Sequence, residues 1–156
     1  TGDETGVEVA VVQRDQLWTS TADYTTPLRP HQESFAIGAG EGLAVAVEVA
    51  TPIADDVRDY LEEAGIGVAR LIALSPPAGP KDNAIADAAA ANAFAVGLRD
   101  AIRKALRGHR QVHLFLAGPM GLSLLLGHRW NRLAPTTVYE DLGAAVGYAP
   151  AFTVTA

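Results

Sequence analysis

Apolar and polar positions along this chain switch repeatedly between a strand-like and a helix-like spacing. Val112 to Ala117 is a short apolar run, typical of a buried parallel strand, and it ends at the turn Gly118-Pro119. Beyond the turn, apolar residues recur every three or four positions, which predicts a helix with this buried stripe: Leu122, Leu125, Leu126, Trp130 and Leu133. Thr136 to Glu140 follows as another strand. The stretch is therefore predicted to be a βαβ unit with a right-handed crossover.

The first third of the chain is predicted to contain strands and one long connection. Val7 to Gln13 alternates enough to form a strand, which we place at an edge. Arg14 to Glu33 is polar and contains prolines, so it is predicted to be a long connection or a hairpin that covers the sheet. Within it, Trp18 is either a plug over the core or a platform on which a base stacks. Gly38 to Gly42 precedes a β-rich run, which favours a hairpin turn or bulge over a dinucleotide-binding loop.

Two helices are predicted to lie between interior strands. Thr51-Pro52 supplies a side-chain cap followed by proline at the first helical position, and the buried stripe that follows is Ile53, Val57, Tyr60, Leu61 and Ala64. The second helix is predicted to run from a cap at Asp82 or Asn83 to about Arg107. Gly97 inside this helix is expected to pack closely on the sheet.

The order of these elements predicts the fold class. From Leu43 onward, strands alternate with helices, and Tyr148 to Thr155 forms a last strand that Pro150 confines to an edge. We therefore expect an α/β fold, with a mostly parallel, Rossmann-like sheet flanked by helices and antiparallel additions at its margins.

Composition and charge narrow the possible functions. The 156 residues are 49% hydrophobic, which suits one globular domain, and the absence of cysteine excludes disulfides and Cys-ligated zinc and agrees with a cytoplasmic location. The net charge of −6 weighs against binding of long DNA or RNA. No apolar span reaches the roughly 18 residues of a membrane helix. Because the chain begins at Thr1 and its only Met is Met120, we expect it to be a domain excised from a larger protein.

Loops at the carboxyl ends of the strands are the candidate ligand-binding segments. Four such loops are predicted: Thr51-Pro52, Ser75 to Asn83, Gly118 to Gly121, and Asp141 to Gly147. The candidate ligand-binding residues at and beside these loops are Ser75, Pro76, Lys81, Asn83, Gly118, Pro119, Met120, Gly121, Ser123 and Glu140. A hydroxyl, a cation and the N-termini of two helices would together hold a phosphate or a ribose edge. The alternative is that the turns at Ser75 to Pro80 and at Gly118 to Gly121 are simply tight βα connections.

Two of these loops are expected to act together. A single long helix joins the strands that precede them, so we expect those strands to be adjacent. Lys81 and the turn Gly118 to Gly121 would then contact one phosphate, and a bulky side chain at Gly121 would fill the approach path.

The sequence contains no persuasive motif for catalysis or metal binding. The four histidines do not share one face of an element; His113 is predicted to be a buried strand residue, whereas His128 and Arg129 are expected to face solvent. Ser75 and Ser123 lack the glycine pattern of a nucleophile elbow. We therefore assign no catalytic and no metal-binding residue, and we expect no cofactor.

The last third of the chain also resembles a known family. The run HLFLAGPMGLSLLLGHRWNRL, followed by TTVYED and GYAPAF, is similar to the C-terminal part of SAVED domains, which are CARF-like sensor modules of bacterial cyclic-oligonucleotide anti-phage (CBASS) systems. LAVAVEVATPIADDVRDYL and LIALSPPAGP, which precede the Ala-rich helix, are similar to the same family. The resemblance covers roughly Phe35 to Val154.

This resemblance implies a binding module that senses a cyclic di-, tri- or tetranucleotide and controls a fused or associated effector, such as a nuclease. The family is described as two CARF-like halves, and this chain suffices for about one, so a shared pocket would be completed by a ligand-induced homo-oligomer. Two alternatives stay open. One is an enzyme, either a cyclic-nucleotide phosphodiesterase that uses Lys81 or a nucleoside-processing hydrolase. The other is a structural oligomerisation domain. We do not expect catalysis by this domain alone.

Overall fold

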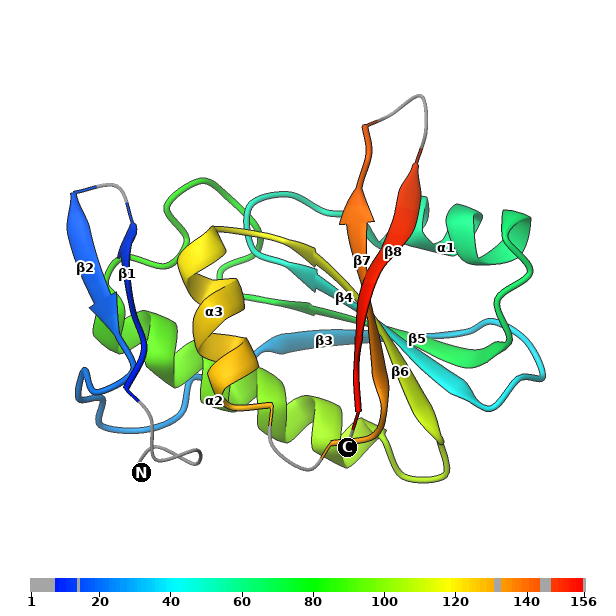
Figure 1. Cartoon of the computed structure of the whole chain (residues 1–156), viewed down its shortest axis with the longest axis horizontal. Helices are drawn as coiled ribbons and strands as arrows, with labels where there is room; N and C mark the ends of the chain where they lie inside the picture. The colour runs from blue at the N-terminus through cyan, green and yellow to red at the C-terminus, as the bar shows by residue number, and fades with distance from the viewer. Residues whose placement is uncertain (1–7, 14, 131–132, 144–146, 156) are drawn as a thin grey trace.

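A six-stranded sheet forms the centre of the molecule (Figure 1), as seen in a computed structural model that describes residues 8–13, 15–130, 133–143 and 147–155. Its strands, in spatial order, are β3 (His31–Ala36), β5 (Val68–Ser75), β4 (Gly42–Glu48), β6 (Gln111–Ala117), β7 (Thr136–Asp141) and β8 (Tyr148–Val154). The inner four run parallel, while β3 and β8 pair antiparallel at the two edges. This confirms the predicted α/β class, and Pro150 lies in an edge strand as expected.

Helices cover both faces of this sheet. α1 (Ala54–Glu63) packs on one face, and α2 (Ala88–Ala105) and α3 (Met120–His128) pack on the other (Figure 1). The central strand β4 shows why its sequence is apolar from Leu43 to Val47. Leu43, Val45 and Val47 belong to the core beside α2 and α3, whereas Ala44 and Ala46 belong to the core beside α1. Every residue of β4 is thus buried, as in a parallel strand covered on both sides.

The order of the parallel strands differs from the prediction that β5 and β6 are adjacent. β4 lies between them and pairs with both. The chain leaves β4 through α1 to reach β5 on one side, and then returns through α2 to β6 on the other side. Two right-handed crossovers in opposite directions place their helices on opposite faces, and α1 and α2 do lie on opposite faces. The chain thus adds β5 on one side of β4 and β6 on the other, so the topological switch point of the sheet lies between β4 and β6.

The helices also begin and end at different residues from those predicted. α1 begins at Ala54, and the Glu48 carboxylate, not Thr51, accepts its first N–H groups. α2 begins at Ala88 because Asp87 accepts from the N–H of Ala90 at 2.8 Å. The segment before α2 consists of turns, so the predicted caps at Asp82 or Asn83 are wrong.

α3 ends at His128, earlier than the periodicity predicted. Trp130 lies beyond the helix, half-buried, and its indole Nε1 donates to the Thr136 hydroxyl at 2.9 Å. His128 and Arg129 are buried rather than solvent-facing, with only 7% and 2% of their surface exposed. Arg129 reaches the carbonyl of Ser20 at 3.5 Å, since the N-terminal part of the chain covers this end of α3.

The N-terminal strands form a separate hairpin. β1 (Ala10–Gln13) and β2 (Gln16–Thr19) make a two-stranded antiparallel sheet that packs on α2 and α3, not at an edge of the main sheet (Figure 1). Trp18 is 3% exposed and joins the core beneath the hairpin, which confirms the predicted plug. The side-chain amide of the buried Asn92 in α2 donates to the Thr19 carbonyl at 2.6 Å, which connects the hairpin to α2.

Two glycine predictions need correction. Gly97 packs against the backbone of Leu28, where an added Cβ would collide with the Leu28 carbonyl, so the connection after the hairpin, and not the sheet, explains this glycine. The segment from Gly38 to Gly42 is not a hairpin turn, because β5 lies between β3 and β4, but the pairing of β4 with β5 shifts register between Gly42 and Leu43, which agrees with the predicted bulge. The dinucleotide-binding loop is correctly rejected, since the segment leads into a strand.

Candidate functional site

Three chain segments meet where the winding direction of the sheet reverses. After β4, the N–H groups of Val49 and Ala50 donate to the Ala117 carbonyl at the end of β6, at 2.9 and 3.0 Å. The Val49 carbonyl accepts from the N–H of Lys81 at 2.9 Å, which draws in the loop after β5. Lys81 and Gly118 therefore come to one place even though β5 and β6 are not neighbours. In parallel sheets, this reversal point is where ligands bind.

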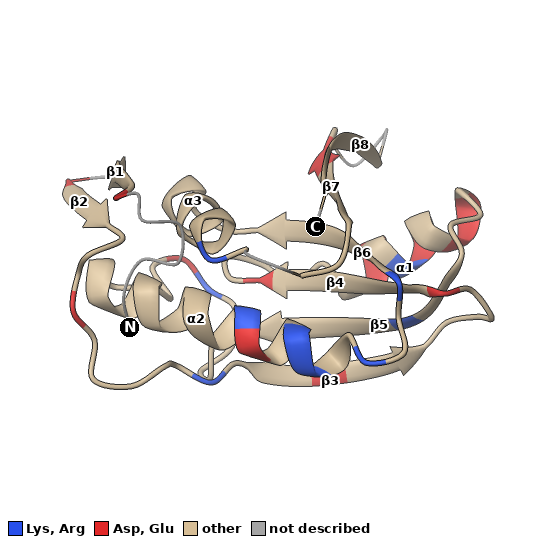
Figure 2. Cartoon of the chain, turned by 60° about the horizontal axis from the view of Figure 1, so that its bottom comes forward, with Lys and Arg blue, Asp and Glu red and all other residues tan. Residues whose placement is uncertain are grey.

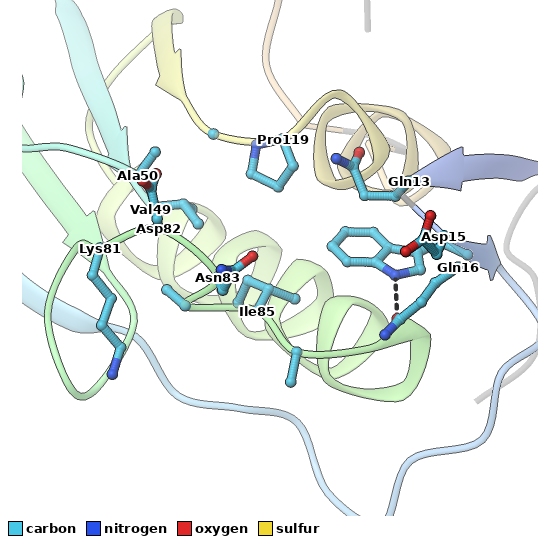
Figure 3. A pocket seen from close by; sticks show the side chains of 14 residues that line it. Gln13, Asp15, Gln16, Val49, Ala50, Lys81, Asp82, Asn83, Ile85 and Pro119 are labelled. Atoms are coloured by element: carbon cyan, nitrogen blue, oxygen red, sulfur yellow. Dashed lines mark hydrogen bonds between the residues drawn. The ribbon is translucent and has the colours of Figure 1, made fainter.

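A cavity of about 560 Å³ opens at this point, within the roughly 300–1,000 Å³ range of small-molecule sites (Figure 3). Its floor consists of Val49, Ala50, Gly118 and Pro119. Residues 81–86 form one wall, and the hairpin forms the other with Gln13, Asp15, Gln16 and Trp18. The cavity thus lies between the sheet and the hairpin.

The charges of the cavity walls are unevenly placed. Lys81 is exposed at one end, and its side chain forms no ion pair with any described residue. Asp15 lies at the opposite end on the hairpin, and Asp82 lies near Val49 and Ala50 (Figure 3). Lys81 is the one cation among the described residues that line the cavity. The cavity therefore has its one lysine and the Asp82 carboxylate on one side, and the Asp15 carboxylate with the amides of Gln13 and Gln16 on the hairpin side.

The N-termini of the three helices are each capped from within the chain. Glu48 Oε2 accepts from the N–H groups of Ile53 and Ala54 at 2.6 and 3.0 Å at α1, and Asp87 caps α2. At α3, Gln13 Oε1 accepts from the N–H of Gly121 at 3.0 Å. Asp87 and Gln13 thus each take up one N–H group at the two N-termini of the predicted phosphate site, which leaves fewer N–H groups there than the sequence predicts.

Four of the ten predicted site residues line the cavity. They are Lys81, Asn83, Gly118 and Pro119. Ser75 and Pro76 are buried at the end of β5, and Ser75 lines a different cavity, of about 550 Å³, beside Glu48 on the α1 side. Ser75 and Pro76 thus do not face the same cavity as Lys81, and ligand contact at the four lining residues stays a prediction.

The remaining four predicted residues lie outside this cavity. Met120 is 70% exposed, Ser123 is exposed on α3, and Glu140 is exposed at the end of β7, where it pairs with Ala149. Gly121 lies under the hairpin, where an added Cβ would be 2.8 Å from Cε3 of Trp18. A side chain at Gly121 would therefore displace the hairpin, and would not fill an approach path as predicted.

Sequence reasoning missed the hairpin wall. Gln13, Asp15 and Gln16 are polar residues between two short apolar stretches, and nothing in their spacing links them to the later loops that line the cavity. The one available signal was Trp18, whose large apolar ring in a polar segment had to be buried against something.

A second group of polar and aromatic side chains is structural. Tyr139 stacks on Phe115 with ring centroids 4.3 Å apart, and its hydroxyl lies 2.7 Å from Nδ1 of the buried His113. Burial lowers the pKa of His113, while burial and the neighbouring Tyr60 raise the pKa of Tyr139 to about 12. Both groups are therefore neutral near pH 7 and belong to the core beneath α1. Across the described ranges, no three His, Cys, Asp or Glu side chains are arranged to hold a metal ion.

Comparison with solved structures shows the same fold in bacterial receptors. Two structures of the Acinetobacter baumannii Cap4 SAVED/CARF-domain containing receptor, with the cyclic trinucleotides 2′3′3′-cAAA and 3′3′3′-cAAA, each match with a TM-score of 0.77 at 15% identity. Each match covers 96% of this chain and 32% of the receptor. The Moraxella osloensis Cap4 SAVED/CARF-domain containing receptor matches with a TM-score of 0.69 at 13% identity, over 95% of this chain and 30% of the receptor. This chain thus spans about a third of the length of these receptors.

The other comparisons complete the assignment. A search of curated proteins gave no match. Among the helices of the described residues, none has the length and apolar character needed to cross a membrane. The family model for the SMODS-associated and fused to various effectors sensor domain matches residues 1–154. The chain therefore belongs to the SAVED family of sensor domains.

Proposed function

We propose that this SAVED domain binds a cyclic di-, tri- or tetranucleotide and that one nucleotide of the ring occupies the cavity between the hairpin and the ends of β4 and β6. The observation that carries this proposal is the position of the cavity. It lies where parallel sheets bind ligands, in a chain of a sensor family, and Lys81 lines it without an ion-pair partner among the described residues.

The uneven charge of the cavity supports one orientation of the nucleotide. A phosphate is attracted to the Lys81 end and repelled by the carboxylate of Asp15 at the hairpin end. The base would therefore lie toward the hairpin. Trp18 is too deeply buried to be an open stacking platform, so it serves as the wall behind the base.

The cavity would contact only part of a cyclic oligonucleotide. A ring with two to four phosphates would meet a single lysine here. The other nucleotides would contact surfaces outside this cavity, either elsewhere in a longer receptor or on a second copy of the chain. Ligand-induced association and control of a fused or associated effector, such as a nuclease, are parts of this proposal that depend on those surfaces.

Incubation with defined ligands tests the proposal. The domain is mixed with cyclic di-, tri- and tetra-adenylate and with their guanine and uracil counterparts, and each mixture is followed by calorimetry and by chromatography of the nucleotide. We expect at least one ring to bind and to be recovered intact. Recovery of a linear product would instead indicate a phosphodiesterase. No heat and no retention with any ring would show that this chain has no such site.

A further inference from the structure

One side chain of the cavity wall is held in a fixed orientation. The indole Nε1 of Trp18 donates to Oε1 of Gln16 at 3.1 Å, and Figure 3 shows this bond at the hairpin end of the cavity. An indole N–H can only donate, so the atom that it contacts must be the carbonyl oxygen of the amide. The hydrogen bond thereby settles which end of the Gln16 amide faces Trp18.

The rest of the hairpin keeps this pair in place. Gln16 and Trp18 are two positions apart in β2, so their side chains share one face, while Leu17 points to the other face and is 60% exposed. Trp18 is 3% exposed, and its ring packs directly over Gly121 of α3. Gln13, opposite Gln16 in β1, is bound to the N–H of Gly121. The tryptophan that orients Gln16 is therefore itself immobilised by the core.

The indole of Trp18 uses one of the two lone pairs of Gln16 Oε1 and holds that oxygen on its own side, so the Nε2 end of the amide stays open. Its Nε2 carries two N–H groups and donates to no side chain or backbone group in the part of the chain that the structure describes. Gln16 is exposed and lines the cavity. A ligand that contacts the open Nε2 end of this amide therefore meets two N–H donors, while Oε1 is held against the indole.

From this geometry we infer that Gln16 is a base-reading residue, which selects a nucleobase with a hydrogen-bond acceptor on the edge facing the hairpin, and that Trp18 is the positioning residue that sets this preference. The inference rests on the proposed binding of a cyclic oligonucleotide. A phosphate is a poor alternative occupant, because Asp15 lies beside Gln16 and Lys81 lies at the far end. A ring nitrogen such as N1, N3 or N7 of adenine, or a base carbonyl, fits the free donors. An exocyclic amino group at the same place does not fit.

Replacement of single base atoms tests this inference. The first probe is 3′3′3′-cAAA, and matched rings carry 1-deaza-, 3-deaza- or 7-deaza-adenine, each of which replaces one acceptor nitrogen by C–H. If cAAA does not bind, the ring from the panel that binds most tightly replaces it, with its own acceptors removed one at a time. Calorimetric titrations use the parent domain, Gln16→Leu, Trp18→Phe and the control Leu17→Ala, whose side chain lies on the opposite face of β2.

We expect one deaza ring to bind the parent about three- to tenfold more weakly, the size of a single neutral hydrogen bond. The Gln16→Leu variant should bind the unmodified ring more weakly than the parent does, by a similar factor. The same variant should bind the deaza ring and the unmodified ring with equal affinity. Trp18→Phe removes the orienting N–H together with part of the buried ring, so it should lose most of this discrimination, provided that a thermal melt shows it folded. Leu17→Ala should behave like the parent.

Two results would overturn the inference without touching the proposed function. The first is a Gln16→Leu variant that binds every ring with the affinity of the parent. The second is a Gln16→Leu variant that weakens every ring by the same factor and still discriminates against the same deaza ring, which would place a phosphate or ribose at Gln16. If the parent binds no ring in the panel, the proposed function fails and the inference fails with it.

Discussion

At the scale of single residues, Gly121 separates two explanations of the Gly-Pro turn. The sequence suggested a glycine that lets a phosphate approach, whereas the structure places Trp18 against it. Gly121→Ala should lower the free energy of unfolding by about 1–3 kcal/mol, because the methyl group collides with a packed ring. The matched control is Gly127→Ala in the same helix, where an added Cβ meets nothing within 4 Å and should stabilise by up to about 1 kcal/mol. Equal melting temperatures for the two variants would contradict the packing described for the hairpin.

Glu48 is a second residue whose role follows from its contacts. Its carboxylate is buried at the end of β4 and accepts two N–H groups at the start of α1. Glu48→Ala leaves both N–H groups without that acceptor and should cost about 1–3 kcal/mol of stability, as measured by urea unfolding. Glu63→Ala removes an exposed carboxylate from the last turn of the same helix and should change stability little. A similar loss in both variants would mean that the charge of α1, and not the cap, is responsible.

His113 makes stability depend on pH in one direction. Burial lowers its pKa below the ordinary value of 6.5, so as the pH falls through that value the unfolded chain takes up a proton that the folded chain resists. The contribution of His113 to stability should therefore be constant above about pH 6.5, and stability should fall as the pH drops below that value. Thermal melts between about pH 7.5 and 5 measure this effect. His113→Phe should flatten the dependence, whereas the exposed control His31→Asn should retain it; an unchanged slope in His113→Phe would refute the assignment.

At the scale of elements, the sequence predicts the sheet better than it predicts the hairpin. β4, β5 and β6 are apolar runs bounded by turn residues, and such runs are readable because burial on both faces allows little else. The caps could not be placed in the same way. Thr51-Pro52 has the right local chemistry, but the carboxylate of Glu48 reaches the first N–H groups of α1 from the strand. Local propensity does not contain that tertiary contact.

The hairpin illustrates the same limit for the site. Gln13 and Gly121 are 108 positions apart, and their hydrogen bond depends on how α3 is oriented. Lys81 and Gly118 were predicted together on the ground of adjacent strands, which is wrong, yet they do line one cavity because the loop after β4 bridges them. Periodicity placed both segments at the carboxyl end of the sheet, where this cavity lies. The wall opposite Lys81 required the folded chain.

At the scale of the whole molecule, the distribution of charge argues against binding of long nucleic acid. Cations gather on the second half of α2 at Arg99, Arg103 and Lys104, where Asp100 interrupts them, and α1 on the other face carries mostly acidic residues (Figure 2). With a net charge of −6, the domain lacks the many phosphate contacts that duplex binding needs. We expect no salt-sensitive binding of random duplex DNA at submicromolar protein in fluorescence anisotropy. A steep fall of affinity with added salt would show a phosphate-tracking surface.

The most direct test of the central claim is a calorimetric titration of the cavity's lysine. The parent domain, Lys81→Ala and the control Arg107→Ala, which removes an exposed cation outside the cavity, are each titrated with the ring that binds the parent. The Lys81→Ala variant loses a charge-assisted hydrogen bond, so its binding free energy should be weaker by about 1.5–3 kcal/mol, with stability little changed. Arg107→Ala should bind like the parent. A folded Lys81→Ala variant with the parent's affinity would place the nucleotide elsewhere and contradict the account.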